Sequence, residues 1–205
     1  HLNCAHPWQS TPMYSALIEI SQPTLATDET LHTTLTDLMA AQTVQNALIA
    51  ENLSQAEQFW RMREQISAAQ KAQGKNIKHD VSVPISAIAQ FIEQTDVALA
   101  QKYHGIQTVV FGHIGDGNVH FNVSAGTAFA NPDALMAHES VINQMVYEHV
   151  QLFNGSISAE HGIGLLKREL MNSIKSNVEL QTMRAIKHAL DPHNRMNPHK
   201  IFSDS

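Results

Sequence analysis

The feature that most constrains the fold is a short turn signal, Asp116-Gly117, inside the run FGHIGDGNVHFN. Asp-Gly between apolar residues favours a two-residue type I′ hairpin, because both central positions of that turn need a positive φ. With Asp116 and Gly117 at those positions, His113 pairs with His120 across the two strands. Directly opposed side chains of a hairpin lie about 5 Å apart on one face. We therefore expect a pair of imidazoles that can bind one metal ion, with Asn122 on the same face.

The composition is typical of a globular chain and limits the classes of partner that we expect. The chain has 205 residues, 43% of them hydrophobic, and a formal net charge of −6. No cluster of lysine and arginine stands out, so we expect no nucleic-acid partner. No apolar run approaches the roughly 18 residues that a membrane-spanning helix needs, and one cysteine, Cys4, excludes an internal disulfide. Residues 1–12 read as a linker or a mid-chain start, so we expect a piece of a longer protein.

Strand-like and helix-like patterns alternate along the rest of the chain. Beside the hairpin, strands are expected over residues 13–21, 44–50 and 77–83. Apolar residues at helical spacing predict helices between the strands, and they include residues 54–73, 164–174 and 176–190. Strands separated by helices, together with one hairpin, predict an α+β fold. We expect a ferredoxin-like antiparallel sheet layered with helices, plus a C-terminal helical extension.

A divalent ion in a catalytic site needs a third ligand beside two imidazoles. Glu160 lies in the glycine-flanked loop SAEHGIG, which is irregular enough to turn a carboxylate toward the hairpin. His113, His120 and Glu160 would then form a set of two histidines and one carboxylate. The adjacent His161 points the opposite way in an extended loop, and a neutral imidazole is a suitable base at neutral pH. The alternative is that all four are ordinary, solvated hairpin and loop residues.

Three residues form a candidate anion clamp. Arg63 and Ser67 are i,i+4 neighbours on the helix expected over 54–73, and Lys78 follows on the next strand. A guanidinium offers a carboxylate two parallel donors, and an ammonium offers a point charge. The clamp suits a substrate carboxylate, and the alternative is a solvated helix face.

Two long motifs give the chain a resemblance to a known family. GHIGDGNVHFNV is followed by GSISAEHGIGLLKREL and then by ALDPHNRMNPHKIF, with WRMRE and IKHDVSVP in support. From about residue 13 to residue 202 the chain resembles the C-terminal, substrate-binding half of the FAD-linked oxidases that act on 2-hydroxy acids. That family includes D-2-hydroxyglutarate dehydrogenase, D-lactate dehydrogenase and the glycolate oxidase D subunit. The resemblance implies a substrate- and metal-binding domain over 13–205, with the N-terminal FAD-binding domain absent.

The resemblance also implies roles for single residues. In the family, the two hairpin histidines and the glutamate of Ser-Ala-Glu-His-Gly hold a divalent metal, often zinc, and these positions are His113, His120 and Glu160 here. His161 resembles the base that takes the hydroxyl proton of the substrate. Asn122 is similar to a residue that orients the substrate.

Further positions match with small departures. Arg63 and Lys78 match basic residues that hold a substrate carboxylate, and Ser67 stands where a close relative has threonine. The tail motif Asn-Pro-Gly-Lys of the family approaches the flavin, which makes Asn197 the expected cofactor contact. In this chain His199 replaces the glycine of that motif. Asn194 also stands where glycine is common, and asparagine tolerates the left-handed conformation.

The implied function is an oxidoreductase that converts a D-2-hydroxy acid to a 2-oxo acid, with FAD as hydride acceptor and an electron acceptor of unknown identity beyond it. This chain is expected to be inactive alone. Its expected partners are a small 2-hydroxy acid, the FAD domain of the same protein and a second copy in a homodimer. The expected location is the cytoplasm, with peripheral membrane attachment as the alternative. Two other functions stay open: a non-haem metal enzyme with a two-histidine, one-carboxylate site, and a non-catalytic metal-binding domain.

Overall fold

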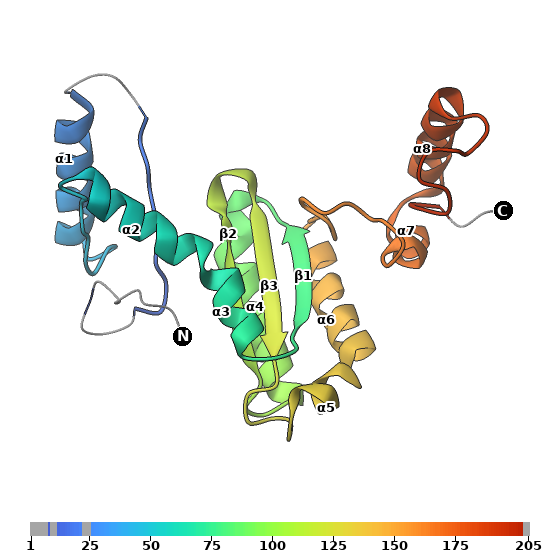
Figure 1. Cartoon of the computed structure of the whole chain (residues 1–205), viewed down its shortest axis with the longest axis horizontal. Helices are drawn as coiled ribbons and strands as arrows, with labels where there is room; N and C mark the ends of the chain where they lie inside the picture. The colour runs from blue at the N-terminus through green and yellow to red at the C-terminus, as the bar shows by residue number, and fades with distance from the viewer. Residues whose placement is uncertain (1–7, 9–11, 22–25, 203–205) are drawn as a thin grey trace. The chain divides into compact units, whose positions relative to one another are not determined.

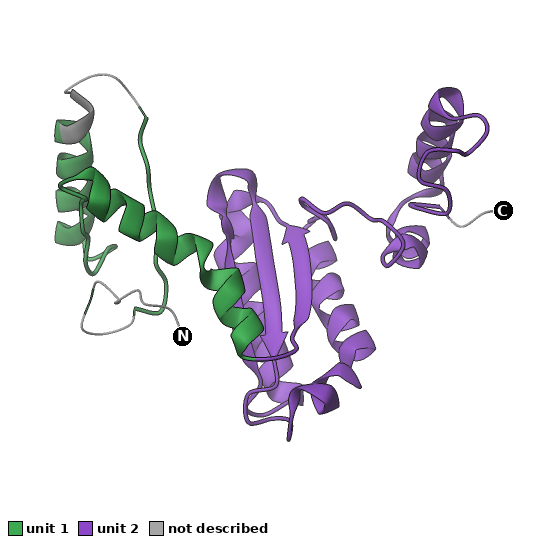
Figure 2. Cartoon of the chain, viewed as in Figure 1, with its two compact units in different colours: residues 1–73 green, residues 74–205 purple. Residues whose placement is uncertain are grey.

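The computed structural model describes Trp8, residues 12–21 and residues 26–202. The chain divides into two compact units, residues 1–73 and residues 74–205 (Figure 2). No helix among the described residues is long and apolar enough to cross a membrane.

The first unit is helical. It contains α1 (Ala26–Ala40), α2 (Leu53–Glu64) and α3 (Ile66–Ala72). The backbone over 13–21 and 44–50 is irregular, so the strands expected there are wrong. An alternating pattern forms a strand only where a neighbouring strand supplies backbone hydrogen bonds. Within the described residues these segments have no such neighbour, and Met13 and Ile18 stay 88% and 63% exposed.

The helix expected over 54–73 is interrupted. α2 begins after Asn52, whose side chain accepts a hydrogen bond from the backbone N–H of Gln55 at 3.0 Å. It ends at Glu64, and α3 begins at Ile66, so Gln65 alone separates the two helices. Arg63 therefore lies in the last turn of α2 and Ser67 in the first turn of α3, on either side of the break.

The second unit holds a three-stranded antiparallel sheet, which confirms the α+β class (Figure 1). Its strands are β1 (Ile77–Ser82), β2 (Gln107–His113) and β3 (Asn118–Ser124), in the order β1-β3-β2. Its helices are α4 (Ile88–Lys102), α5 (Pro132–Met136), α6 (Glu139–Leu152), α7 (Arg168–Ile174) and α8 (Asn177–Leu190). Two short 3-10 turns, η1 (Ile85–Ala87) and η2 (Ile114–Asp116), complete the unit. The two helices near the C-terminus are thus confirmed, although α7 begins later than the sequence predicts.

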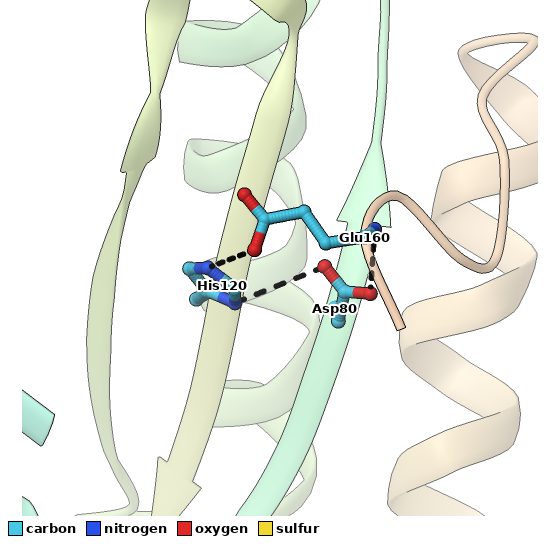
Figure 3. Close-up of side chains that lie close together, drawn as sticks. All are labelled: Asp80, His120 and Glu160. Atoms are coloured by element: carbon cyan, nitrogen blue, oxygen red, sulfur yellow. Dashed lines mark hydrogen bonds and ion pairs between the residues drawn. The ribbon is translucent and has the colours of Figure 1, made fainter. Parts of the chain in front are cut away.

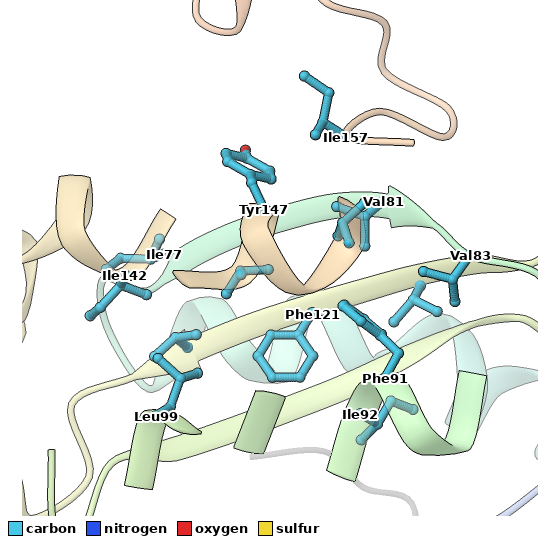
Figure 4. Packing of buried hydrophobic residues seen from close by; sticks show 14 of the residues in the cluster. Ile77, Val81, Val83, Phe91, Ile92, Leu99, Phe121, Ile142, Tyr147 and Ile157 are labelled. Carbon is cyan, nitrogen blue, oxygen red and sulfur yellow. The ribbon is translucent and has the colours of Figure 1, made fainter. Parts of the chain in front are cut away.

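One face of the sheet carries the hydrophobic core (Figure 4). Every second residue of β3 is buried there, and Val119, Phe121 and Val123 are at most 2% exposed. Phe121 packs edge-on against Phe91 of α4, with ring centroids 5.8 Å apart. Full burial of such a side chain contributes about 1.5–3 kcal/mol. This burial fixes which side of each strand faces the helices, and so it also fixes which side chains face away from them.

The turn between β2 and β3 is longer than the Asp-Gly signal predicts. η2 and Gly117 fill it, with Gly117 at φ 73° and ψ 7°. His113 pairs with Asn118 and His120 pairs with Phe111, so the direct pairing expected for the two histidines is wrong. The register differs from the expected one by two positions. Because strand side chains alternate with a period of two, His113 and His120 still lie on the same face.

The longer turn has a local cause. Of the two residues in the Asp-Gly signal, only Gly117 has a positive φ, while Asp116 stays in the 3-10 turn. The N–H of Gly117 donates to the carbonyl oxygen of Ile114 at 3.1 Å, and its own carbonyl accepts from the N–H of Val83 at 3.0 Å. The glycine thus places the turn against the chain that leaves β1, and a Cβ at this position would meet the Val83 carbonyl oxygen.

Strand β1 also carries a titratable side chain that lies among the core residues, His79, which is 1% exposed. Its Nδ1 lies 2.8 Å from the carbonyl oxygen of Phe121, and its Nε2 lies 2.8 Å from the Asn143 side chain. A carbonyl only accepts, so Nδ1 carries a proton. Burial lowers the pKa of His79 to about 4, although both hydrogen bonds oppose that shift. The folded chain therefore holds this imidazole neutral at physiological pH.

Substitution of Gly117 by alanine is expected to lower the free energy of unfolding by about 1–3 kcal/mol, because the new Cβ is strained by the positive φ and meets Val83. Gly115→Ala is a matched control in the same motif, since Gly115 has no atom within 4 Å of the added Cβ. The control should stay within about 0.5 kcal/mol of the unchanged chain in urea unfolding. Equal effects of the two substitutions would contradict the observed turn.

The buried His79 predicts a pH dependence of stability. Its pKa in the folded chain, about 4, lies below the ordinary value of 6.5, so the unfolded chain binds the extra proton between these values. Stability is therefore fully present above pH 6.5 and is lost as the pH falls toward 4, by about 3 kcal/mol from this group. His79→Gln removes the titration and should flatten that part of the curve. His104→Gln, at an exposed histidine, should leave the slope unchanged.

Candidate metal and substrate site

The face of the sheet opposite the core is polar. In the register of β1 and β3, Asp80 pairs with His120 and Lys78 pairs with Asn122. Asp80 and Asn122 are each 4% exposed, whereas Lys78 is exposed. The strand alternation that buries the apolar residues therefore gathers these four side chains on one surface.

A loop that follows α6 is anchored to the end of β1. Ser82 and Ser156 form an isolated antiparallel bridge with backbone hydrogen bonds of 2.9 and 2.8 Å. Gly155 permits this approach, because a Cβ there would meet the Ser82 carbonyl oxygen. Lys167 holds the loop from its other end, as its Nζ donates to the carbonyl oxygen of Ile157 at 2.6 Å and to that of Asp80 at 3.3 Å.

The buried carboxylate of Asp80 joins the sheet to this loop (Figure 3). Its Oδ2 accepts the backbone N–H groups of Glu160 and His161 at 3.0 and 2.8 Å, and its Oδ1 accepts from Nδ2 of Asn118 at 3.1 Å. Burial raises the pKa of the Asp80 carboxyl, but the N–H groups of His161 and Glu160, together with the nearby side chains of His161 and Lys167, outweigh that effect. The pKa therefore lies below its ordinary value, and the group is an anion at neutral pH.

Glu160 brings the predicted ligands together. One of its carboxylate oxygens lies 3.3 Å from Nδ1 of His113, and the other lies 3.7 Å from Nε2 of His120. Nδ1 of His120 lies 3.8 Å from Oδ1 of Asp80. One ligand atom each from Asp80, His120 and Glu160 lies within 4.8 Å of the others. The structure thus gathers the three residues that the sequence predicted and adds Asp80 to them.

The donor set fits a divalent cation of intermediate softness. Imidazole nitrogen and carboxylate oxygen are ligands that zinc accepts. Burial lowers the pKa of His120, and the carboxylates of Glu160 and Asp80 offset this only in part. The imidazole is therefore neutral at neutral pH, which is the form that binds a metal.

His161 lies beside this group on the solvent side. Its side chain is 69% exposed, and its Nδ1 is 3.6 Å from Oδ2 of Asp80. Its ring centroid is 6.0 Å from that of His120. The imidazole is thus next to the predicted ligands and open to a molecule that arrives from solvent.

The remaining predicted residues fall in different places. Lys78 and Asn122 share the polar face with His120. Arg63 and Ser67 belong to the first unit, so they are placed only within α2 and α3. Asn197 follows α8, in a tail that turns through several left-handed residues.

That tail confirms one expectation about backbone conformation. Asn194 has φ 48° and His199 has φ 63°, so both positions where the family commonly has glycine take the left-handed conformation that glycine favours. Asparagine adopts it at small cost, whereas a histidine there is more strained.

Sequence reasoning missed three residues of the site: Asp80, Asn118 and Lys167. The alternation of 77–83 already placed Asp80 on the non-core side of its strand, beside Lys78. What the sequence did not contain was the pairing of β1 with β3, which sets Asp80 opposite His120. Lys167 acts through two backbone carbonyls, and such contacts leave no trace in residue spacing.

Comparisons with known proteins identify the family of the chain. A model of the family "FAD linked oxidases, C-terminal domain" matches residues 4–201. The chain is 44% identical over 159 residues, 78% of its length, to a D-2-hydroxyglutarate dehydrogenase of Xanthomonas citri pv. viticola, and 32% identical over 96% of its length to one of Stutzerimonas stutzeri. A mitochondrial D-2-hydroxyglutarate dehydrogenase of Danio rerio is 30% identical over the whole chain. The chain spans 33%, 42% and 37% of the length of these relatives. It therefore belongs to the family of FAD-linked oxidase C-terminal domains.

Proposed function

We propose that this chain is the substrate- and metal-binding part of a flavin-dependent dehydrogenase that oxidises D-2-hydroxy acids to 2-oxo acids. The observation that carries the proposal is the approach of Glu160 to both His113 and His120 on the polar face of the sheet. Membership of the FAD-linked oxidase family favours this function over a non-haem oxygenase and over a non-catalytic metal-binding domain. The activity is that of a whole protein in which an N-terminal part binds FAD.

The proposed ligands of the metal are His113, His120 and Glu160, and the proposed ion is zinc. Two neutral imidazoles and one carboxylate leave a positive charge on a bound divalent ion and an open position for substrate. When bound, the ion acts as a Lewis acid that lowers the pKa of the substrate hydroxyl. The protein contributes the arrangement of the ligands, which come from β2, β3 and the loop after α6.

His161 is the proposed base. It would take the proton of the substrate hydroxyl. FAD, when held by another part of the protein, would supply the acceptor for the α-hydrogen and its electron pair. The imidazolium that results is stabilised by the anionic Asp80, whose Oδ2 lies 3.6 Å from Nδ1 of His161. The exposed position of the ring suits a base that must meet a substrate from solvent.

A dicarboxylate is the proposed substrate class. Lys78 and Asn122 lie opposite each other, two positions along the strands from Asp80 and His120. Two residues of a strand span about 7 Å, a spacing comparable with that of the terminal carboxylates of an extended five-carbon dicarboxylate. Lys78 would therefore hold the distal carboxylate while the hydroxy acid end meets the histidines. D-2-Hydroxyglutarate fits these demands better than lactate.

Two substitutions separate the proposed ligand from the proposed base. Glu160→Gln removes the charge of the only anionic ligand, so zinc affinity should fall more than the about 10–100-fold typical for loss of an outer partner of a ligand. His161→Ala should leave zinc stoichiometry unchanged, because alanine keeps the backbone N–H that donates to Asp80 and the imidazole is not a proposed ligand. In the whole FAD-containing enzyme the same substitution should lower turnover by a factor of about 10² to 10⁴.

The measurements are zinc stoichiometry on the chain and turnover with D-2-hydroxyglutarate on the whole enzyme. Glu93→Gln and His104→Ala are matched controls at exposed positions outside the site. If His161→Ala removes the zinc and Glu160→Gln does not, the two roles are exchanged. If neither variant changes zinc content, the histidines are ordinary surface residues and the proposal is wrong.

The chain is also expected to purify colourless and to reduce no artificial electron acceptor, since its family is defined by a C-terminal domain and its relatives are much longer. Titration of the 205-residue chain with FAD, followed by the flavin fluorescence, is the test. Tight, stoichiometric binding of FAD would show that the flavin site lies within these residues. Weak or absent binding agrees with a flavin site in another part of the protein.

A further inference from the structure

We propose that Asp80 is the positioning residue of this site. One of its carboxylate oxygens holds the backbone of Glu160 and His161, and the other sets the orientation of His120. The inference rests on the proposed function, because these three residues are the proposed ligands and base. It explains why side chains from separate segments of the chain come together at this site.

The first part of the inference concerns Oδ2. The N–H groups of two consecutive residues, Glu160 and His161, converge on this one oxygen at 3.0 and 2.8 Å. Both bonds are charge-assisted, which makes them roughly twice as strong as bonds between neutral groups. Both hydrogen bonds use backbone atoms of Glu160 and His161, so they do not occupy the side chains. The side chain of Glu160 reaches the hairpin histidines, and that of His161 faces solvent. The backbone of the loop is thus fixed independently of what its side chains bind.

The second part concerns Oδ1. This oxygen accepts a hydrogen bond from Asn118 and lies 3.8 Å from Nδ1 of His120. A negative charge on that side favours the tautomer with the proton on Nδ1, while the carboxylate of Glu160 on the Nε2 side favours the other tautomer. The Nδ1–H tautomer, which Asp80 favours, leaves the lone pair on Nε2, the nitrogen that lies toward Glu160 at 3.7 Å. A carboxylate behind a metal-binding histidine commonly fixes the ring in this way.

A direct role as metal ligand is the alternative, because Asp80 lies within 4.8 Å of atoms of His120 and Glu160. Two observations favour positioning. Oδ2 is already occupied by two backbone donors, and Oδ1 is held by the amide of Asn118. The side chain is also only 3% exposed, and a carboxylate this buried needs its donors to offset desolvation. Coordination of an ion would compete with those donors.

The test uses two variants of the whole 205-residue chain without metal. Asp80→Ala removes both oxygens, and the amides of Glu160 and His161 should exchange hydrogen about 10–100-fold faster. Asp80→Asn keeps one oxygen for those N–H groups and removes the charge. Asn118 can follow this change by turning its amide, since its Oδ1 is buried without a hydrogen-bond partner among the described residues. Asp80→Asn should therefore keep exchange near the original rates. The His120 tautomer should shift toward Nε2–H, because the carboxylate of Glu160 then acts alone, and nitrogen chemical shifts measure this change.

Asp96→Asn is the matched control. Asp96 is a partly buried carboxylate of α4 that accepts one hydrogen bond, from Thr108 at 2.8 Å, and it lies outside the site. It should change neither the exchange of the loop amides nor the His120 tautomer. Unchanged exchange in Asp80→Ala, or an unchanged tautomer in Asp80→Asn, would overturn the positioning role. Should Asp80→Ala fail to fold, the tautomer in Asp80→Asn decides.

A separate measurement of metal binding distinguishes a positioning role of Asp80 from a role as metal ligand. Zinc affinity of Asp80→Asn should fall about 10–100-fold, while the visible spectrum of bound Co²⁺ should keep its shape because the ligands are the same. A changed Co²⁺ spectrum in Asp80→Asn would overturn the proposal in favour of direct ligation. If the original chain binds no zinc at all, the proposed metal site fails, and the metal-free exchange and tautomer results still decide the role of Asp80.

Discussion

Phe121 lies at the centre of the apolar face of the sheet, fully buried and edge-on to Phe91. Strand side chains alternate, so burial of this ring turns His120 and Asn122 toward the opposite face. A slip of one position would expose Phe121 and bury His120, with a loss of about 1.5–3 kcal/mol for the ring alone and a further cost for the buried imidazole. The candidate site is therefore placed by the packing of the core, and its polar residues need no bound ion to reach the same surface.

The same register places a carboxylate where the loop after α6 needs an acceptor. Glu160 and His161 lie in an irregular segment, outside any helix or strand, so their backbone N–H groups need another acceptor. Asp80 supplies one, and Lys167 supplies a donor to the carbonyl groups on the same side. The sheet and the loop thus supply hydrogen-bond partners to each other's polar groups. Buried backbone N–H and C=O groups need such partners. A ligand that enters such a site meets groups already in place, so less of its binding free energy is lost to ordering the chain.

The sequence predicted the face of each hairpin residue but not the pairing. The Asp-Gly turn predicted that His113 and His120 share a face, and that part was right because the observed register differs from the expected one by an even number of positions. Their register depends on the length of the turn, and Gly117 was needed for an approach to Val83 that no local pattern records. The same limit explains Asp80, whose side of the strand was predictable while its neighbour across the sheet was not. For the apolar residues of 13–21 the sequence pattern was misleading, because it does not show whether a strand has a partner.

Burial also divides the proposed substrate contacts into two kinds. Lys78 is exposed, and an exposed ammonium attracts a carboxylate weakly and with strong dependence on salt. Asn122 is 4% exposed, so a molecule that displaces its surroundings must match its donor and acceptor groups or leave them unsatisfied in a dry environment. Discrimination by a polar group of this kind is much stronger than discrimination by charge at the surface. On the proposed function, Lys78 would then favour the approach of dicarboxylates in general, and Asn122 would decide which of them is held in the orientation that brings its hydroxyl to His161.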